Sequence, residues 1–538
     1  MNEHRLRAPT GDGALLAVPP LAEVPALLQA NAARLAVWDH DFQGRPASRL
    51  RFEVRDQILN SAGRYLRASG LDTRVVPESS RLLVTGHQPE LFHPGVWIKN
   101  FALANLAKRT DSVALNLIVD NDIPKSSALK VPRTVEDGFR IEKVFFDDWA
   151  GEIPYEDLKV EDEALFTSFA DRVRAVLGNA ISDPVIDEFW PRALNAANAS
   201  NRVGLRFAMA RRAVEASWGI HNLEVPLSTV CESEGFQWFA CHLFAHLPRF
   251  QQVHNEALGR YRSQYGIRSA HHPVPALGRQ GEWLEAPFWV WRASRPRRKP
   301  LMVRQRSRTI QLRIGGEEET LLELPLGPDR EACCAVDQLQ ELPSRGVRLR
   351  TRALTTTMFA RYLLGDLFLH GIGGAKYDEL GDEISGRFFG IEPPGYLTTS
   401  MTLRLGLDAG TGASVDLART DREIRDLVWN PDRHLLSEAR ADPEAIRWID
   451  AKRCAVGGPV ETHAQRVARF YEIRRCHERL QEFVADRLES ARRERVALIQ
   501  AVEREKVARS REYSLVLHSR QHLREALNLA LPGRFGSD

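Results

Sequence analysis

Histidine, lysine and aspartate side chains gather behind two short apolar segments early in the chain, and these residue types can move protons or bind phosphate. Six candidates follow the first segment, residues 82–84: Gly86, His87, Gln88, His93, Gly95 and Lys99. His87 could be a general acid or base, because histidine ordinarily titrates near pH 6.5. His93 and Lys99 could contact phosphate. The alternatives are a turn-capping histidine and a lysine that faces solvent.

Two aspartates, Asp120 and Asp122, follow the second apolar segment, residues 112–119. Their carboxylates could bind Mg²⁺ through water or position a substrate amine. The competing interpretation is a polar turn in which an aspartate caps Ile123-Pro124.

The elements around these candidates form one predicted unit. We expect a buried strand at residues 81–84, a turn at Thr85-Gly86, a helix over residues 97–109 and a second strand from residue 112. A strand, a helix and a strand at this spacing favour a right-handed parallel crossover. The candidates would then meet at the carboxyl edge of an open sheet, where ligands bind and a helix N-terminus favours anions.

A glycine-rich segment farther along the chain has a similar pattern. Residues 366–370 predict a strand, and the segment that follows opens a helix and supplies four candidates: Gly371, Gly373, Lys376 and Tyr377. Glycines there would let the backbone approach a ligand closely, although they also serve plain turns. Arg352 is a candidate for carboxylate recognition because a guanidinium binds carboxylates in bidentate fashion.

Composition and charge narrow the classes of function. The 538 residues are 43% hydrophobic and 27% charged, with a formal charge of +3, which gives no global reason to bind nucleic acid. We interpret the basic cluster at residues 292–308 as a solvated loop or hairpin, with contact to an anionic substrate as the alternative. Without an apolar run of about 18 residues we expect no membrane span. The N-terminus, with Glu3, His4 and Arg5, lacks a signal-peptide core, so we expect a cytoplasmic protein.

The six cysteines are scattered and form no CxxC pair, so we expect reduced structural thiols and no metal site. A nucleophilic Cys231 or Cys241 is the alternative. Residues 1–47 predict a surface leader with a helix at 24–38, and residues 49–69 predict another helix. Strands are expected at residues 284–291, 302–303 and 310–314.

The C-terminal part changes composition near residue 421. We expect a core domain over residues 1–420, with the leader and an inserted helical segment, and a helical domain over residues 421–538. Two helices are predicted, at 421–455 and 460–528. The second carries a broken near-heptad seam: Phe470, Ile473, Leu480, Val484, Leu488, Ala491, Leu498 and Val502. This pattern favours a homodimer formed through the helices, and the competing interpretation is a helix packed on its own core.

With these pieces placed, residues 80–530 resemble the bacillithiol-biosynthesis cysteine ligase (BshC-like) family. The matches to its motifs are residues 85–88 for a TGQQ-like turn, 93–96 with Lys99 for TGPLY-x-x-x-K, 120–122 for an acid-rich EDHD-like strand end, 371–377 for GPGE-x-x-Y and 390–394 for its "mP" segment. His87, Val119 and Gly374 depart from the family pattern, which places a glutamine, an acid and a glutamate there.

The resemblance implies an α/β fold with a Rossmann-like nucleotide-binding core and a dimerising C-terminal coiled coil. It also implies an ATP-dependent ligase that joins an amino acid, with cysteine as one candidate, to a small amino-sugar or acidic acceptor in low-molecular-weight thiol biosynthesis. ATP or ADP, with Mg²⁺, would be bound. Residues 93–96 also resemble half of the HxGH signature, so nucleotidyl transfer is an alternative. A non-catalytic dimer that binds a nucleotide or metabolite is another.

Overall fold

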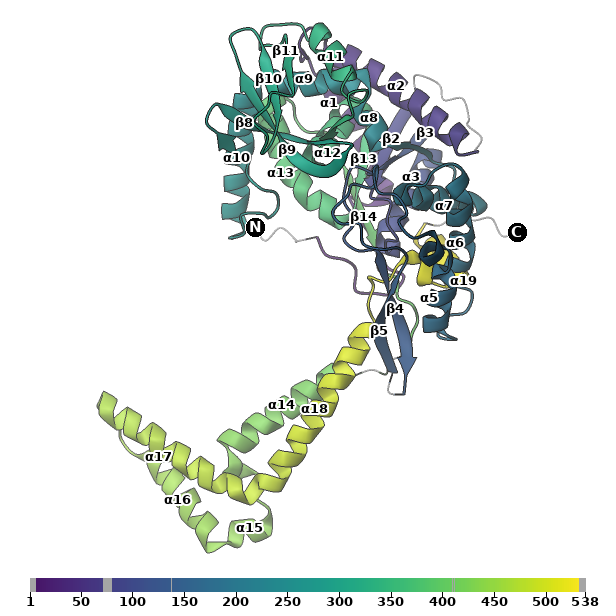
Figure 1. The fold of residues 1–538 in the computed structure, drawn as a ribbon. Helices are drawn as coiled ribbons and strands as arrows, with labels where there is room; N and C mark the ends of the chain where they lie inside the picture. Colours follow the sequence, from purple (N-terminus) through teal and green to yellow (C-terminus); the bar gives the residue numbers. More distant parts are fainter. Residues whose placement is uncertain (1–5, 71–79, 137, 409, 411, 532–538) are drawn as a thin grey trace. The chain divides into compact units, whose positions relative to one another are not determined.

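The computed structural model describes residues 6–70, 80–136, 138–408, 410 and 412–531 (Figure 1). Glu3, His4 and Arg5, on which the signal-peptide argument rests, lie outside this range. The chain divides into two compact units. The first comprises the described parts of Met1–Val131, Glu142–Leu405 and Arg511–Asp538, and the second comprises Pro132–Ile141 and Gly406–Ser510. The boundary predicted at residue 421 falls inside a helix of the second unit, and the last part of the chain belongs to the first.

The first unit is organised around a six-stranded sheet in the order β1-β14-β13-β2-β3-β6. The strands are β1 (Leu15–Val18), β2 (Arg81–His87), β3 (Ser112–Ile118), β6 (Leu223–Pro226), β13 (Leu367–His370) and β14 (Leu397–Met401). All neighbours are parallel except the edge pair β1 and β14. The molecule is therefore a mixed α/β protein with a parallel sheet, and the predicted parallel β2–β3 pair is confirmed. The leader prediction missed β1.

The first strand is longer than its apolar core. Leu82, Leu83 and Val84 are fully buried, but the pairing with β3 continues to His87, which lies opposite Ile118. The predicted turn at Thr85-Gly86 was therefore wrong. The chain turns after Gln88 instead and enters α3 (Pro94–Arg109), which packs against β14, β3 and β2.

The order in which the chain fills the sheet reverses once. From β2 it moves outward through β3 to β6, and it later returns to place β13 on the other side of β2 and β14 beyond it. In open parallel sheets, ligands bind outside the carboxyl ends of the strands at such a reversal. The connection after β13 is α13 (Ile372–Phe389), so α3 and α13 both begin at this edge.

A second sheet has the order β11-β10-β9-β8-β12 and is antiparallel. Its strands are β7 (Arg279–Gln280, paired with β8), β8 (Trp283–Arg292), β9 (Arg295–Gln305), β10 (Ile310–Ile314), β11 (Leu322–Leu324) and β12 (Val347–Thr351). The strands predicted between residues 284 and 314 are confirmed, and the basic cluster lies on and beyond the β8–β9 hairpin. From β12 the chain passes through α12 (Ala353–Phe359) and a short π-helix (Ala360–Leu364) into β13.

The remaining elements complete the first unit and its border with the second. They are α1 (Val24–Ala36), α2 (Ala47–Ala68), β4 (Ala128–Val135), β5 (Gly138–Phe145), α4 (Glu163–Thr167), α5 (Phe169–Leu177), α6 (Ile186–Asn195), α7 (Val203–Ser217), α8 (Leu227–Cys231), α9 (Glu234–Ala245), α10 (Leu247–Gln264), α11 (Cys333–Gln340) and α19 (Arg520–Ala530). The helices predicted at 24–38 and 49–69 are confirmed as α1 and α2.

The second unit contains α14 (Ala413–Trp429), α15 (Ser437–Ala441), α16 (Pro443–Gly457), α17 (His463–Gln481) and α18 (Ala485–Ala508). The single helix predicted over residues 460–528 was wrong, because the chain leaves the α-helix at Glu482–Val484 and again after Ala508. Ion pairs between Glu423 and Arg487 and between Asp421 and Arg495 join α14 and α18 in antiparallel fashion.

The middle of the predicted seam is buried inside this second unit. Leu480, Val484, Leu488 and Ala491 pack with Leu427 of α14 in one cluster, as the competing interpretation of a helix on its own core expected. Phe470, at the start of the seam, is 51% exposed. The homodimer stays a prediction.

Two further expectations concern the chain as a whole. Among the described residues, no helix is both long enough and apolar enough to cross a membrane. Cys231 and Cys241 are buried, and burial raises the pKa of the Cys231 thiol to about 12 and that of Cys241 further still. A thiol with so high a pKa is a poor nucleophile, which disfavours the catalytic alternative for both.

Candidate functional site

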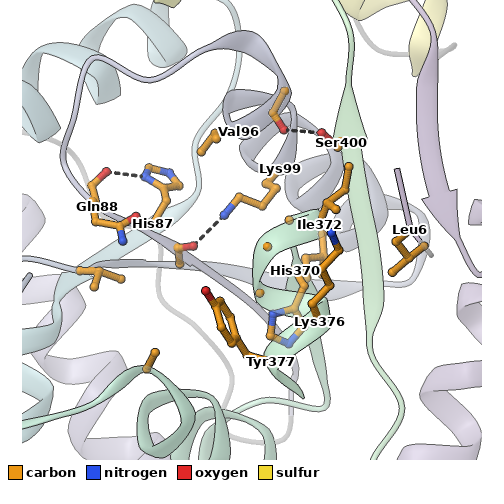
Figure 2. A pocket seen from close by; sticks show the side chains of 18 of the residues that line it. Leu6, His87, Gln88, Val96, Lys99, His370, Ile372, Lys376, Tyr377 and Ser400 are labelled. Carbon is orange, nitrogen blue, oxygen red and sulfur yellow. Dashed lines mark hydrogen bonds between the residues drawn. The ribbon is translucent and has the colours of Figure 1, made fainter. Parts of the chain in front are cut away.

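A cavity of about 730 Å³ lies at the carboxyl ends of β2 and β13, where the strand order reverses (Figure 2). Ten of the thirteen site residues predicted from the sequence line it: Gly86, His87, Gln88, His93, Gly95, Lys99, Gly371, Gly373, Lys376 and Tyr377. The two motif regions, almost 300 residues apart in sequence, therefore form the walls of one site. The parallel pairing of β2 with β13 brings them together.

Lys99 supplies a buried ammonium group to this cavity. The side chain extends from α3, is only 5% exposed, and donates a hydrogen bond of 2.7 Å to the carbonyl oxygen of Gly86. Figure 2 shows Lys99 and Tyr377 extending into the same space from α3 and α13. Burial lowers the pKa of Lys99 to about 7, because removing an ammonium from water disfavours its charged form. An anion in the cavity would compensate that charge.

The imidazole of His87 is held by protein groups at both nitrogens. Nδ1 lies 3.1 Å from the carbonyl oxygen of Gln88, and Nε2 lies 3.1 Å from Oδ1 of Asn100. The amide of Asn100 donates in turn to Glu215 at 2.6 Å, which fixes its orientation. Burial, with Arg211 and Lys99 nearby, lowers the pKa of His87 well below its usual range. The geometry favours a structural role over the acid or base role.

The N-terminus of α3 is already satisfied by its own residues. His93 is the N-cap, and its Nδ1 accepts a hydrogen bond of 3.1 Å from the backbone N–H of Gly95. The N–H of Val96 donates to the carbonyl oxygen of His93 at 2.9 Å, and Pro94 has no N–H. The expectation that this helix end offers free N–H groups to phosphate was therefore wrong. Burial lowers the pKa of His93, whose Nε2 lies 3.6 Å from Glu512.

Gly95 is required by packing. A Cβ atom there would lie 2.5 Å from the carbonyl oxygen of Met401 and closer still to the guanidinium of Arg511. Ser400 holds the same turn by donating to the carbonyl oxygen of Gly95 at 3.2 Å. The glycine thus lets α3 meet the end of β14 at the rim of the cavity.

The N-terminus of α13 is different because its cap has no side chain. Gly371 is the N-cap without a side-chain hydrogen bond, and the first backbone bond into the helix runs from Ala375 to Gly371. Within the part of the chain that the structure describes, the N–H groups of Ile372, Gly373 and Gly374 have no acceptor. All three residues line the cavity. Free first-turn N–H groups at a helix N-terminus bind anions.

A histidine that the sequence interpretation missed stands at the end of β13. His370 lines the cavity, and its Nε2 lies 2.7 Å from Oδ2 of Asp378. Asp378 also accepts from Arg361 at 2.8 Å and from Thr357 at 2.6 Å. These partners outweigh burial and lower the pKa of Asp378 to about 2. The pair places an oriented imidazole beside the free helix end. A histidine at a strand end directly before glycine was the signal that could have identified it.

The charged side chains that line the cavity are mostly basic. They are Arg7, Lys99, Lys125, Lys376 and Arg511, against the single acid Glu512. Because the whole chain carries a formal charge of only +3, this excess is local and favours an anionic ligand.

Asp120 lies outside this cavity. It is buried, and its carboxylate accepts from the backbone N–H of Ser228 at 2.8 Å and from the Ser228 hydroxyl at 2.5 Å. Burial, with Glu156 nearby, raises the pKa of Asp120 to about 7. The carboxylate ties the end of β3 to α8, so the expected catalytic group is used in the fold.

Asp122 and Arg352 line a second cavity of about 300 Å³. Asp122 accepts from Gln88 at 2.9 Å, from Arg298 at 2.8 Å and from the backbone N–H of Ile123. The last bond is the cap of Ile123-Pro124 expected in the competing interpretation. Arg298 comes from the basic cluster, and the alternative of its contact with an anionic substrate stays a prediction.

The fold and the site together define an α/β protein with a cavity of mainly basic charged residues at the reversal of a parallel sheet. No family model matches the chain, and comparison with curated proteins gives no match. Among the described residues, no group of three or more His, Cys, Asp or Glu side chains is arranged to hold a metal ion.

Proposed function

We propose that the first cavity binds the phosphates of ATP and that the protein is a BshC-like ligase, which joins an amino acid to a small amino-sugar or acidic acceptor. The observation that carries this proposal is the set of three free N–H groups at the start of α13, across the cavity from the buried ammonium of Lys99. Helix N-termini and lysine ammonium groups are the donors that bind polyphosphates in many nucleotide sites.

The sheet supports a Rossmann-like interpretation of the core. Numbered in chain order, the five parallel strands run 3-2-1-4-5, which is the order of dinucleotide-binding sheets apart from their last strand. The cavity lies at the reversal between the first and fourth of them, as in such folds. The resemblance in residues 85–88 and 371–377 concerns the same two walls.

ATP, when bound, supplies the activated phosphoryl group. The N–H groups of α13 and the ammonium of Lys99 would stabilise negative charge that develops there, because they are fixed before the reaction begins. His370, oriented by Asp378, would take the proton of the attacking amine. Glu512 is the single carboxylate among the described lining residues, so Mg²⁺ would be held mainly by phosphate oxygens and water. We propose the cytoplasm as the place of this activity.

Nucleotide binding is tested by thermal shift with ATP, ADP and AMP, with and without Mg²⁺. A nucleotide at 100 times its dissociation constant should stabilise the folded state by about 2.7 kcal/mol. Gly373→Leu should abolish this response. A Cβ atom at Gly373 meets open space, so the leucine side chain would fit there and occupy the part of the cavity proposed for the phosphates. Gly259→Leu is the matched control, since Gly259 is an exposed helical glycine with equally open surroundings.

The products then separate the reaction classes in a screen of amino acids and sugar amines. ADP and phosphate indicate a ligase of the proposed kind, and AMP with pyrophosphate indicates nucleotidyl transfer. Nucleotide binding without consumption in any mixture would favour the non-catalytic binding protein. An unchanged ATP response in Gly373→Leu would refute the proposed phosphate site.

We also propose a homodimer formed through the second unit. Phe470 of the seam and its neighbour Tyr471, both in α17, are 51% and 62% exposed, so this end of the seam is not buried within the unit. Sedimentation of the wild type and of the double variant Phe470→Glu, Tyr471→Glu tests it. A wild-type monomer, or a dimer in both proteins, would contradict this role for α17.

A further inference from the structure

The second cavity lies directly beside the first. The two share four lining residues, Gln88, Val119, Ala353 and Thr356. A molecule in the second cavity would therefore contact the wall of the phosphate site. Its volume of about 300 Å³ equals about ten water molecules of the liquid, enough for a compact organic molecule of about ten non-hydrogen atoms.

The walls of the second cavity are mainly apolar. The apolar side chains that line it include Phe250, Leu277, Trp289, Leu354, Met358 and Ile384. Phe250, Leu277, Leu354 and Met358 are buried in the fold. A cavity with such walls favours an aliphatic or aromatic group, because apolar contact replaces water there at no cost in lost hydrogen bonds.

One polar group of the second cavity is oriented but incompletely paired. Arg352 donates from Nη2 to Glu285 at 2.6 Å, and its guanidinium carbon lies 4.1 Å from the centre of the Trp289 ring. Glu285 is itself fixed by the backbone N–H of Gly278 at 2.9 Å. The Nε atom of Arg352 is inaccessible to a water-sized molecule, so a ligand in the cavity would meet the other guanidinium nitrogens. Among the described residues, the bond from Nη2 to Glu285 is the one hydrogen bond of this side chain, so the other Nη donors would favour an acceptor from a ligand.

The other charges of the second cavity compensate one another. Asp122 is neutralised by Arg298 at 2.8 Å, and Gln88 donates to its second oxygen. Burial lowers the pKa of Arg352, and Glu285 opposes this shift. The positive charge of the guanidinium is therefore less well stabilised than it would be in water. The unmet interaction of this cavity is therefore a hydrogen-bond acceptor, preferably an anion, beside Arg352.

We propose that the second cavity binds a small carboxylic acid with an apolar body, whose carboxylate accepts from the guanidinium of Arg352. An apolar amino acid and a simple apolar acid share this chemistry. The assignment rests on the proposed function, in which a carboxyl group is activated beside ATP. The assignment therefore implies a carboxyl substrate that is larger and more apolar than cysteine.

The test is calorimetric titration of the full chain with L-phenylalanine, 3-phenylpropionate, 3-phenylpropionamide and L-cysteine. We expect at least one phenyl acid to bind at least tenfold more tightly than both the amide and L-cysteine. Tighter binding of L-phenylalanine assigns an amino acid, and tighter binding of 3-phenylpropionate assigns a simple acid. The inference is overturned if neither phenyl acid binds, if the amide binds equally well, or if L-cysteine binds more tightly than both.

Variants locate the binding. Arg352→Gln should lower the affinity for the phenyl acid at least tenfold, and so should Val274→Trp, which fills the cavity from a half-buried position. The second variant keeps the test informative if loss of Arg352 impairs folding. Val37→Trp, at an 80% exposed position, is the matched control and should bind like the wild type. Unchanged affinity in Val274→Trp would place the acid elsewhere.

The two proposals fail in different ways. ATP stabilisation that depends on Gly373, together with no binding of the phenyl acids, would leave the nucleotide site standing and overturn only the carboxylate site. Binding of a phenyl acid that depends on Arg352, without any response to nucleotides, would support the carboxylate site and refute the ATP-dependent function.

Discussion

The burial of Lys99 makes a quantitative prediction about stability. An ammonium group at 5% exposure, bonded to one carbonyl oxygen, costs free energy that a neutral side chain of similar length avoids. Lys99→Met keeps most of the volume and removes the charge. We expect the variant to gain stability relative to the wild type at low pH, in the absence of nucleotide, and to gain less as the pH rises.

The magnitude follows from the pKa of the folded state. Burial lowers the pKa of Lys99 from 10.5 to about 7, and one unit corresponds to about 1.36 kcal/mol. Between these values the unfolded chain binds a proton that the folded chain has released, so wild-type stability rises with pH. The cost of the buried lysine is about 5 kcal/mol at pH 6 and about 2 kcal/mol at pH 9. The free-energy gap between the proteins should therefore change by about 3 kcal/mol.

The assay is thermal unfolding of both proteins at pH 6, 7, 8 and 9 without nucleotide. By extension of the size dependence of Tm, the Tm of a unit this large shifts by about 1–2 °C per kcal/mol, so the gap in Tm should narrow by about 3–6 °C from pH 6 to pH 9. The bond lost at Gly86 and the packing of methionine do not depend on pH, so they cancel in this comparison. Lys376→Met, at an exposed lysine of the same cavity, controls for the loss of one positive charge. A gap that stays constant from pH 6 to pH 9 would refute the reasoning.

Three further predictions use other parts of the structure. ATP binding should be coupled to the uptake of about one proton at pH 8 and almost none at pH 6, because phosphates would raise the pKa of Lys99 from about 7. Calorimetry in buffers of different ionisation enthalpy measures this uptake. Proton uptake that persists in Lys99→Met would contradict the prediction. His370→Gln should keep the affinity for ATP but lower turnover with the amine acceptor about 100-fold, so equal turnover would exclude it as the proton acceptor. Leu488→Glu should destabilise the α14–α18 pair by about 3–5 kcal/mol in thermal unfolding followed by helical circular dichroism, whereas Val496→Glu, 57% exposed on the same helix, should change stability by at most about 0.5 kcal/mol.

Sequence patterns over short ranges were enough to predict the part of the site that lies on one βαβ unit. The apolar segment before His87, the helix up to Arg109 and the next strand needed only strand periodicity and the handedness of crossovers. The same rules placed the glycines from Gly371 at the start of a helix. What they could not give was the other neighbour of β2, because the chain returns to that position only at β13, after the 279 residues between His87 and Leu367. The meeting of Lys99 with His370 depends on that return.

Other failures came from partners that are distant in the chain. The sequence placed Asp120 at the same sheet edge as the candidates, but its carboxylate turns to Ser228 at the start of another helix. A heptad-like seam shows that one face of a helix is apolar, and it does not identify what covers that face. Leu480 and Leu488 are covered by α14 of the same chain. The sequence pattern of these leucines would be the same if a second copy of the chain covered them in a dimer.

The contrast between α3 and α13 explains why we place the proposed anion site at only one of two similar helix starts. Both helices follow a parallel strand at the same edge, and both carry glycine in the first turn. In α3 the cap is His93, whose side chain and carbonyl oxygen accept from the first N–H groups. In α13 the cap is Gly371, which has no side chain to accept them, so the donors of the first turn remain directed into the cavity. A cap that stabilises its own helix removes the donors that a ligand needs, and the helix without a side-chain cap leaves them for the phosphate that we propose.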